Sequence, residues 1–197
     1  MTATQLAKPP SAEGRSEYDG KLMTLEEFEL LTSIKPSLEW IGGRAVQKPM
    51  VSNGHGRITL RSARRLDEHS DSAGGFAAVE VHTWFDVPAD PRYLVPDAQY
   101  YAPGKAAGGL WRRALPPTLV IEVRSPDSQT MDFLRGKSRF MRANGVDVCW
   151  LIDPRSRTVE VFEDDADGVV WEGRWLTSVH VPGFALDLEE LWALLDD

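Results

Sequence analysis

The chain has 197 residues, of which 42% are hydrophobic, so it is long enough to bury a sizeable core as one domain. The single cysteine, Cys149, excludes a disulfide framework and a zinc cluster of Cys and His ligands. No segment approaches the roughly 18 uninterrupted apolar residues of a membrane span, and the polar N-terminus lacks the apolar stretch of a signal peptide. These features favour a cytoplasmic protein with no membrane contact.

The net charge of -8 is unevenly distributed along the chain. Residues 53–145 contain 13 basic and ten acidic side chains, whereas residues 146–197 contain three basic and 13 acidic ones. The mildly basic middle segment could face a polyanion. The acidic C-terminal quarter is either a solubilising surface or a contact surface for another protein.

The first third of the chain begins with a polar segment that contains two prolines. We expect a disordered lead over residues 1–20 and one folded domain over 21–197. Thr24 and Glu27 have the spacing of a capping box, which predicts a short helix. The patterns that follow predict a hairpin around a Gly-Gly turn over 37–50 and a helix of about four turns over 52–70.

The rest of the chain alternates between strand and helix patterns. Two strand-like runs cover 76–88 and 92–101, and the most apolar short run, 118–125, is expected to be a central strand. A strand, helix, strand order over 118–154 predicts a crossover unit. A further strand is predicted over 158–165, and the segment 169–176 is followed by a final amphipathic helix over 187–195. The order as a whole predicts an α/β (α+β) fold, with a mixed central β-sheet flanked by helices.

Two carboxylates interrupt the apolar strands. Glu122 lies in the middle of the run "TLVIEVRS", and strand alternation puts Arg124 on the same side. Asp97 follows Pro96 in a second apolar run, and proline often marks the start of a strand in a sheet. A buried charge is costly unless it is paired or bound to a metal, so these residues need partners.

The helix after the central strand offers one such partner. Successive residues at 100° put Lys137 on the apolar side with Phe133 and Phe140, whereas Arg135, Arg139 and Arg142 fall on the opposite side. A lysine on an inward face is rarely buried without a partner. We therefore expect Lys137 to point at the carboxylates.

Two carboxylates and an inward lysine suit metal-dependent hydrolysis of phosphodiesters. Hard oxygen ligands hold Mg2+ or Mn2+, and an ammonium group offsets charge that develops on the phosphate. The same three residues also suit a structural cluster of buried ion pairs. The residues alone leave both interpretations open.

Several segments occur in an order that is informative as a set. They are "VPD" ending at Asp97, "LVIEVRSP" around Glu122, Asp132 with Lys137, and "WLIDP" ending at Pro154. In this order the chain resembles, from about Met23 to Trp192, the Uma-type family of putative restriction endonucleases. That family is placed in the PD-(D/E)xK nuclease superfamily.

The resemblance implies a restriction-endonuclease-like fold in which Asp97 and Glu122 bind Mg2+ or Mn2+. In the superfamily pattern a lysine stands two residues after the glutamate, and Arg124 holds that position here. Family members commonly have a lysine further on, which corresponds to Lys137. The resemblance therefore implies that Asp97, Glu122 and Lys137 are catalytic and that Arg124 is a partner of a phosphate or carboxylate. A glutamate common in the family is replaced by Val148.

Two further residues are candidates for the same site. Glu39 is either an additional acid near the metal or a surface residue of the hairpin. His55 lies on the apolar side of its helix, where it either approaches the site or is a hydrogen-bonded core histidine.

Arginines are the candidates for DNA contact. Each phosphate contact would add to a salt-dependent affinity, although solvated helix faces have the same pattern. A Gly-rich loop with Trp111 suits stacking on bases and contact with phosphates. The candidates are Arg57, Arg61, Arg112, Arg113 and Arg139.

These observations lead to a Mg2+-dependent DNA endonuclease, with a homodimer as one expected assembly. The alternative is a non-catalytic interaction protein that keeps the nuclease fold and uses its acidic C-terminal quarter. A third hypothesis is a metal-dependent hydrolase of another phosphate ester.

Overall fold

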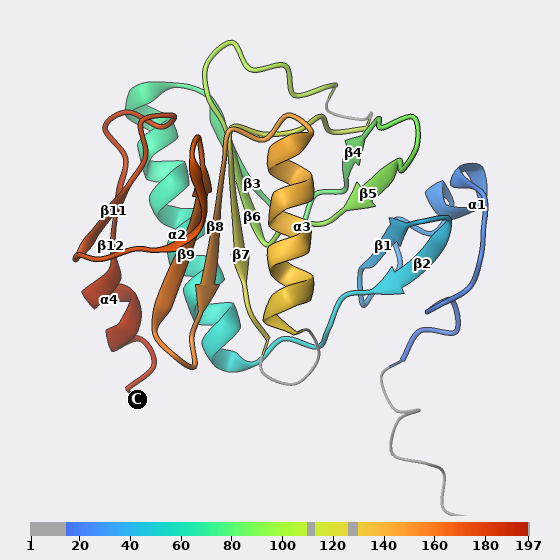
Figure 1. Cartoon of the computed structure of the whole chain (residues 1–197), viewed down its shortest axis with the longest axis horizontal. Helices are drawn as coiled ribbons and strands as arrows, with labels where there is room; N and C mark the ends of the chain where they lie inside the picture. The colour runs from blue at the N-terminus through green and yellow to red at the C-terminus, as the bar shows by residue number, and fades with distance from the viewer. Residues whose placement is uncertain (1–14, 110–112, 126–129, 197) are drawn as a thin grey trace, which may run out of the picture.

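Two β-sheets lie side by side in the fold (Figure 1). The computed structural model describes residues 15–109, 113–125 and 130–196. The larger sheet has six strands, with helix α2 over one face and helix α3 over the other (Figure 1). The predicted mixed sheet flanked by helices is confirmed.

The six-stranded sheet contains the predicted crossover. Its central pair, β7 (Leu119–Val123) and β8 (Val148–Asp153), is parallel, and α3 connects the two strands. The other neighbours are antiparallel. The order is β10-β9-β8-β7-β6-β3, and the outer strands are β3 (Phe76–Val79), β6 (Ala98–Tyr101), β9 (Thr158–Glu163) and β10 (Ala166–Val170).

The four-stranded sheet corrects one expectation about strand length. The runs 76–88 and 92–101 each divide between the two sheets instead of forming one strand each. The break in the first run is at Glu80, whose φ of 51° an ordinary strand cannot accommodate; the break in the second is at Val95 to Asp97. The order is β2-β1-β5-β4, made of β1 (Leu38–Ile41), β2 (Arg44–Gln47), β4 (Thr83–Phe85) and β5 (Arg92–Leu94).

The helices begin where their capping residues stand. The predicted capping box of Thr24 and Glu27 is present at the start of α1. Side chains of Ser52 and Thr130 accept hydrogen bonds from the first turns of α2 and α3, which satisfies donors that have no partner inside the helix. The bounds are α1 (Leu25–Glu29), α2 (Asn53–Ala73), α3 (Met131–Ala143) and α4 (Leu188–Ala193), and a small ladder pairs β11 (Trp175–Thr177) with β12 (Ala185–Asp187).

Alternation along β7 separates two apolar cores. Leu119, Ile121 and Val123 pack toward α2 and α4, whereas Val120 packs toward α3. Glu122 has the same parity as Val120, so its side chain enters the α3 side of the sheet. A third core, around Trp40 and Tyr93, lies between α1 and the smaller sheet.

The N-terminal boundary expected at residue 20 lies inside a segment that contacts the hairpin. Gly20 donates a backbone hydrogen bond to Ala45, and Asp19 accepts one from Gln47. The first 14 residues of the expected lead lie outside the described residues. Among the helices of the described chain, none combines the length and apolarity needed to cross a membrane.

Candidate active site

The candidate site lies where the two sheets meet, around Asp97 and Glu122. The register that pairs Ala98 of β6 with Ile121 of β7 brings Asp97 alongside Glu122. Asp97 Oδ2 accepts a hydrogen bond of 2.7 Å from the backbone N–H of Val123. The two carboxylates that the sequence singled out therefore come from neighbouring strands and lie together.

Lys137 enters this cluster from the second turn of α3. Its Nζ is 2.7 Å from Glu122 Oε1 and 2.6 Å from Glu39 Oε1. Glu39 comes from β1 and also accepts a hydrogen bond from the backbone N–H of Val95. The expectation that Lys137 points at carboxylates agrees with this geometry, and Glu39 is a member of the cluster, not a surface residue.

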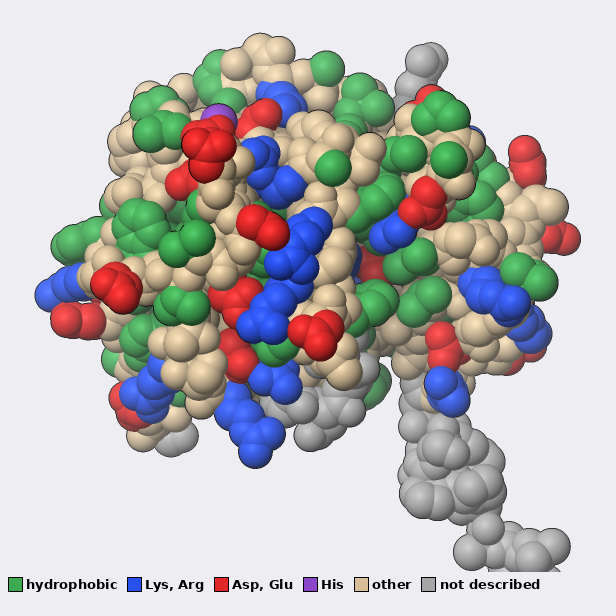
Figure 2. Space-filling model, viewed as in Figure 1, with side chains coloured by type: hydrophobic (Ala, Val, Ile, Leu, Met, Phe, Trp, Pro, Cys, Tyr) green, Lys and Arg blue, Asp and Glu red, His purple; other side chains and the backbone are tan. Residues whose placement is uncertain are grey.

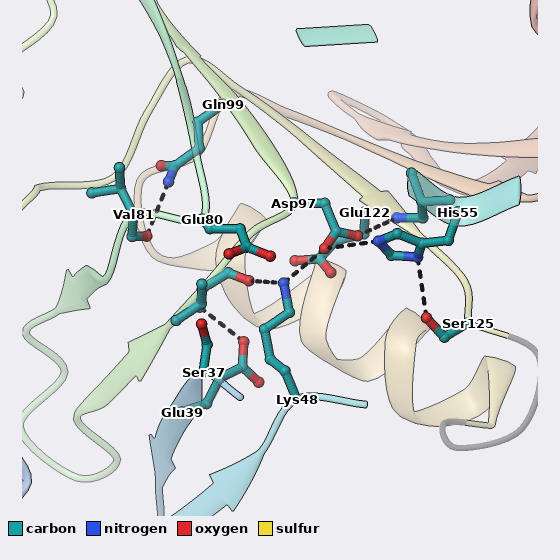
Figure 3. Close-up of polar contacts among 12 residues, drawn as sticks. Ser37, Glu39, Lys48, His55, Glu80, Val81, Asp97, Gln99, Glu122 and Ser125 are labelled. Carbon is teal, nitrogen blue, oxygen red and sulfur yellow. Dashed lines mark hydrogen bonds and ion pairs between the residues drawn. The ribbon is translucent and has the colours of Figure 1, made fainter. Parts of the chain in front are cut away.

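Two more side chains surround Asp97 (Figure 3). Lys48, directly after β2, places Nζ 2.7 Å from Asp97 Oδ1, and His55, in the first turn of α2, places Nε2 3.4 Å from the same oxygen. The other ring nitrogen of His55 is hydrogen-bonded to Ser125 Oγ at 3.1 Å. His55 thus approaches the site, as one of the two interpretations expected.

Lys48 is the residue that sequence reasoning missed. A signal for it exists, because a two-residue turn at Gly42-Gly43 pairs Glu39 with Val46. Val46 therefore shares a face of the hairpin with Glu39. Side chains alternate along a strand, so Lys48, two residues after Val46, lies on that same face. The hairpin pattern thus places Lys48 on the face of the buried Glu39, but it does not predict the observed partner of Lys48, which is Asp97.

All members of this cluster are buried, and their burial and mutual charges shift several of their pKa values. Exposure is 3% for Glu122, and this burial, with the Asp97 charge adding to it, raises the pKa of Glu122 to about 7. Burial also acts on Asp97, but the Lys48 charge and the contact with His55 outweigh it and hold the pKa of Asp97 below its usual range. For Lys137, the charges of Glu122 and Glu39 outweigh burial, so its pKa is raised and it remains an ammonium group.

The carboxylate oxygens of the cluster suit a hard divalent cation that takes only one or two ligands from the protein. Magnesium is usually held by one or two carboxylates and keeps several waters, and Asp97 and Glu122 supply two carboxylates. Within the described residues, no group of three His, Cys, Asp or Glu side chains is arranged around one metal position. Two buried oxygens of the cluster, Glu39 Oε2 and Glu122 Oε1, have no hydrogen-bond partner among the described residues, although Glu122 Oε1 is in ion-pair contact with Lys137.

Arg124 has a carboxylate partner outside the cluster. Its guanidinium contacts Asp153 at 2.7 Å, at the end of the adjacent strand β8. Arg124 directly follows β7, and its backbone N–H donates to the carbonyl of Ile152, so the pairing of β7 with β8 brings Arg124 beside Asp153. Asp153 is thus a carboxylate partner of the kind that the resemblance implied for Arg124, and the phosphate role stays a prediction.

Arg61 and Arg139, two of the candidate arginines on the helices, pair with acidic side chains. Figure 2 shows Lys and Arg side chains in a run over α3, with Asp and Glu side chains beside them. Arg139 contacts Asp167 at 2.7 Å, and Arg135 makes two hydrogen bonds to Glu160. On α2, Arg61 is paired with Glu190. A phosphate would have to compete with these carboxylates.

Arg113 lies beside a separate cavity of about 920 Å³. It contacts Glu29 at 2.6 Å, and its guanidinium is 5.0 Å from the Trp84 ring centroid. None of the described residues that line this cavity belongs to the charged cluster around Asp97. Arg112 and Trp111, the other loop candidates, lie outside the described residues.

Comparison with known proteins gives first the class and then the family. A solved structure of an Anabaena variabilis protein, described as a putative nuclease belonging to DUF820, has a TM-score of 0.75 and 22% identity. The match covers 88% of this chain and 99% of that one, and it shows a restriction-endonuclease-like fold. The family model Uma2, described as putative restriction endonuclease, matches residues 25–190. The chain belongs to this family, so both the expected family and the expected fold are confirmed.

Nuclease chemistry is the class of function that this membership supports. No curated protein matches the chain.

Proposed function

We propose that the chain is a Mg2+- or Mn2+-dependent endonuclease that hydrolyses DNA phosphodiesters at Asp97, Glu122 and Lys137. One observation carries the proposal. Two carboxylates from neighbouring strands and a lysine from the crossover helix meet in one cluster, within a chain of a nuclease family.

Asp97 and Glu122 would hold the metal ion, with waters completing its coordination. When bound, such an ion polarises the phosphate and acidifies a water molecule. Lys137 supplies a fixed positive charge near the reacting phosphate, because its raised pKa keeps it protonated. The same property makes Lys137 unsuited to remove a proton from water. Glu39 is a positioning residue, since it contacts the same Lys137 ammonium group as Glu122 does.

The test is cleavage of DNA by the full chain in Mg2+ or in Mn2+. Supercoiled, linear and single-stranded DNA should be compared, together with RNA and a small phosphate diester to examine the other hydrolase class. We expect metal-dependent nicking or cleavage, and a loss of about 100-fold or more in Glu122→Gln and Asp97→Asn, since each removes a metal ligand.

Matched controls make that result specific. Glu172→Gln and Asp165→Asn make the same chemical changes at exposed positions, and both should retain full activity. Wild-type activity that never exceeds the activity of Glu122→Gln, in either metal and on any DNA form, would overturn the proposal.

A non-catalytic interaction protein is the second candidate. It is favoured by the pairing within the cluster, where Lys48 and Lys137 already neutralise carboxylates. Under this alternative, Mn2+ would neither bind in calorimetry nor change the melting temperature. The proposed enzyme would act in the cytoplasm, and a homodimer would allow it to cut both strands.

A further inference from the structure

Lys48 is a buried ammonium group that the proposed chemistry does not use. Its side chain is 9% exposed and runs from the end of β2 to Asp97 (Figure 3). Nζ donates to Asp97 Oδ1 and to the backbone carbonyl of Val95, each at 2.7 Å. Lys48 therefore places its ammonium group directly on one of the proposed metal ligands.

The oxygens of Asp97 are already in use. Oδ1 is contacted by Lys48 and His55, and Oδ2 accepts the hydrogen bond from Val123. A divalent ion on Asp97 would share this carboxylate with a neighbouring ammonium group. Two cations on one carboxylate repel each other, and the repulsion is large where water is excluded.

The charge balance of the cluster points the same way. Three buried carboxylates, on Glu39, Asp97 and Glu122, face two buried ammonium groups, on Lys48 and Lys137. Even with all three carboxylates ionised, a divalent ion added beside the two ammonium groups leaves an excess of positive charge in a buried place, which is unfavourable. A phosphodiester brings a negative charge that offsets this excess.

We infer that Lys48 is a resident cation that weakens metal binding in the DNA-free chain and couples metal binding to the arrival of the phosphodiester. This inference rests on the proposed function and adds to it an order of events. Metal and DNA bind cooperatively, because the phosphate supplies the charge that lets Lys48 and the metal occupy the site together. Reciprocity requires that the metal strengthens DNA binding by the same factor.

The test is calorimetric titration of Mn2+ into the wild type, Lys48→Met and Lys35→Met. Lys48→Met removes the ammonium group and keeps an unbranched side chain. Lys35→Met is the matched control, because Lys35 is an exposed lysine that pairs with Glu80 and not with Asp97. We expect Lys48→Met to bind Mn2+ on the order of tenfold more tightly than the wild type, within the usual range of coupling between sites. Lys35→Met should bind as the wild type does.

A second experiment uses the wild type alone, so it tests the inference even if Lys48→Met does not fold. Mn2+ is titrated into the wild type with and without a DNA duplex whose linkages are phosphorothioates that resist cleavage. We expect about tenfold tighter Mn2+ binding with the duplex present. In Lys48→Met, or in Lys48→Gln as a second neutral variant, this gain should shrink toward none.

The outcomes separate this inference from the proposed function. Metal-dependent cleavage by the wild type, with equal Mn2+ affinity in Lys48→Met and no gain from DNA, overturns the inference alone. Absence of Mn2+ binding in the wild type and Lys48→Met, with and without DNA, overturns the metal dependence on which both rest.

Discussion

The cluster around Asp97 and the arginine pairs on α3 both join basic side chains to carboxylates, at nearly the same contact distances. Lys137 is 2.6 Å from Glu39, and Arg139 is 2.7 Å from Asp167. The exposed fractions of the side chains differ, at 3% and 1% for the first pair and 50% and 65% for the second. The contact distance therefore does not distinguish the ion pairs of the candidate site from those on the surface, whereas the exposed fraction of the side chains does.

Burial determines how much each ion pair contributes to stability and how readily the pair exchanges one partner for a phosphate. An exposed pair contributes about 0–1 kcal/mol and can exchange its partner for a phosphate at little cost. Removing one member of a buried pair costs about 3–5 kcal/mol, because a charge is left without a partner. The cluster is thus suited to hold charges in fixed positions, and the arginines on the helices are suited to reversible contact.

The largest expected effect on stability is that of Lys137→Met. This change leaves Glu39 and Glu122 buried without their shared cation, so we expect a loss of about 3–5 kcal/mol in the free energy of unfolding. Urea denaturation at neutral pH measures it. Lys105→Met is the matched control, since Lys105 pairs with Asp147 near the surface and should lose about 0–1 kcal/mol. Equal losses in the two variants would contradict the contrast between the regions.

An intermediate effect is expected at Asp153, which is buried but pairs with the partly exposed Arg124. Burial acts to raise the pKa of Asp153, but the hydrogen bond from Arg124 outweighs it, so the pKa lies below its ordinary value of 3.8. The native state therefore binds this proton less readily than the unfolded state does. The resulting stability is present above pH 3.8 and is lost as the pH falls through the lower native pKa.

Asp153→Asn should accordingly lower the free energy of unfolding by about 1.5–3 kcal/mol at pH 7, the usual size of a hydrogen bond to a charged group. Melting temperatures of the wild type and the variant should converge as the pH falls below 3.8. Asp165→Asn, at an exposed position, serves as the control. A difference between wild type and Asp153→Asn that stays constant with pH would show that charge is not its cause.

The smallest effect on stability is expected for Arg139→Gln, within about 1 kcal/mol. Its effect should appear in DNA binding measured at several salt concentrations. Loss of one phosphate contact weakens binding uniformly across sequences and reduces the salt slope by about one. Arg157→Gln, which removes a half-exposed arginine paired with Asp196, is the matched control. An unchanged slope in Arg139→Gln would remove this residue from the DNA surface.

Local sequence patterns predicted those helices and strands whose formation depends on one short segment. The capping box at Thr24, the hairpin at Gly42-Gly43 and the crossover helix were all found from neighbouring residues. Lys137 was placed on the buried face from helical periodicity alone. These features depend on contacts within one or two turns or across one tight turn, so their signal lies within a short stretch.

The features that the sequence did not predict depend on contacts between segments that are far apart in the chain. The run 76–88 alternates throughout, yet the backbone changes sheet at Glu80. Lys48 follows a strand as an ordinary lysine, and its role comes from the distant Asp97. Arg124 had two allowed partners, and the neighbouring strand supplied Asp153.

The sequence by itself determined that two carboxylates and one lysine must be buried, because apolar strands and an apolar helix face surround them. Only the tertiary structure decided which charges meet there. The register of β6 on β7 brings Asp97 to Glu122, and the hairpin brings Glu39 and Lys48 to complete the cluster. The reason is physical: burial follows from local periodicity, whereas the pairing of buried charges is set by contacts between segments far apart in the chain.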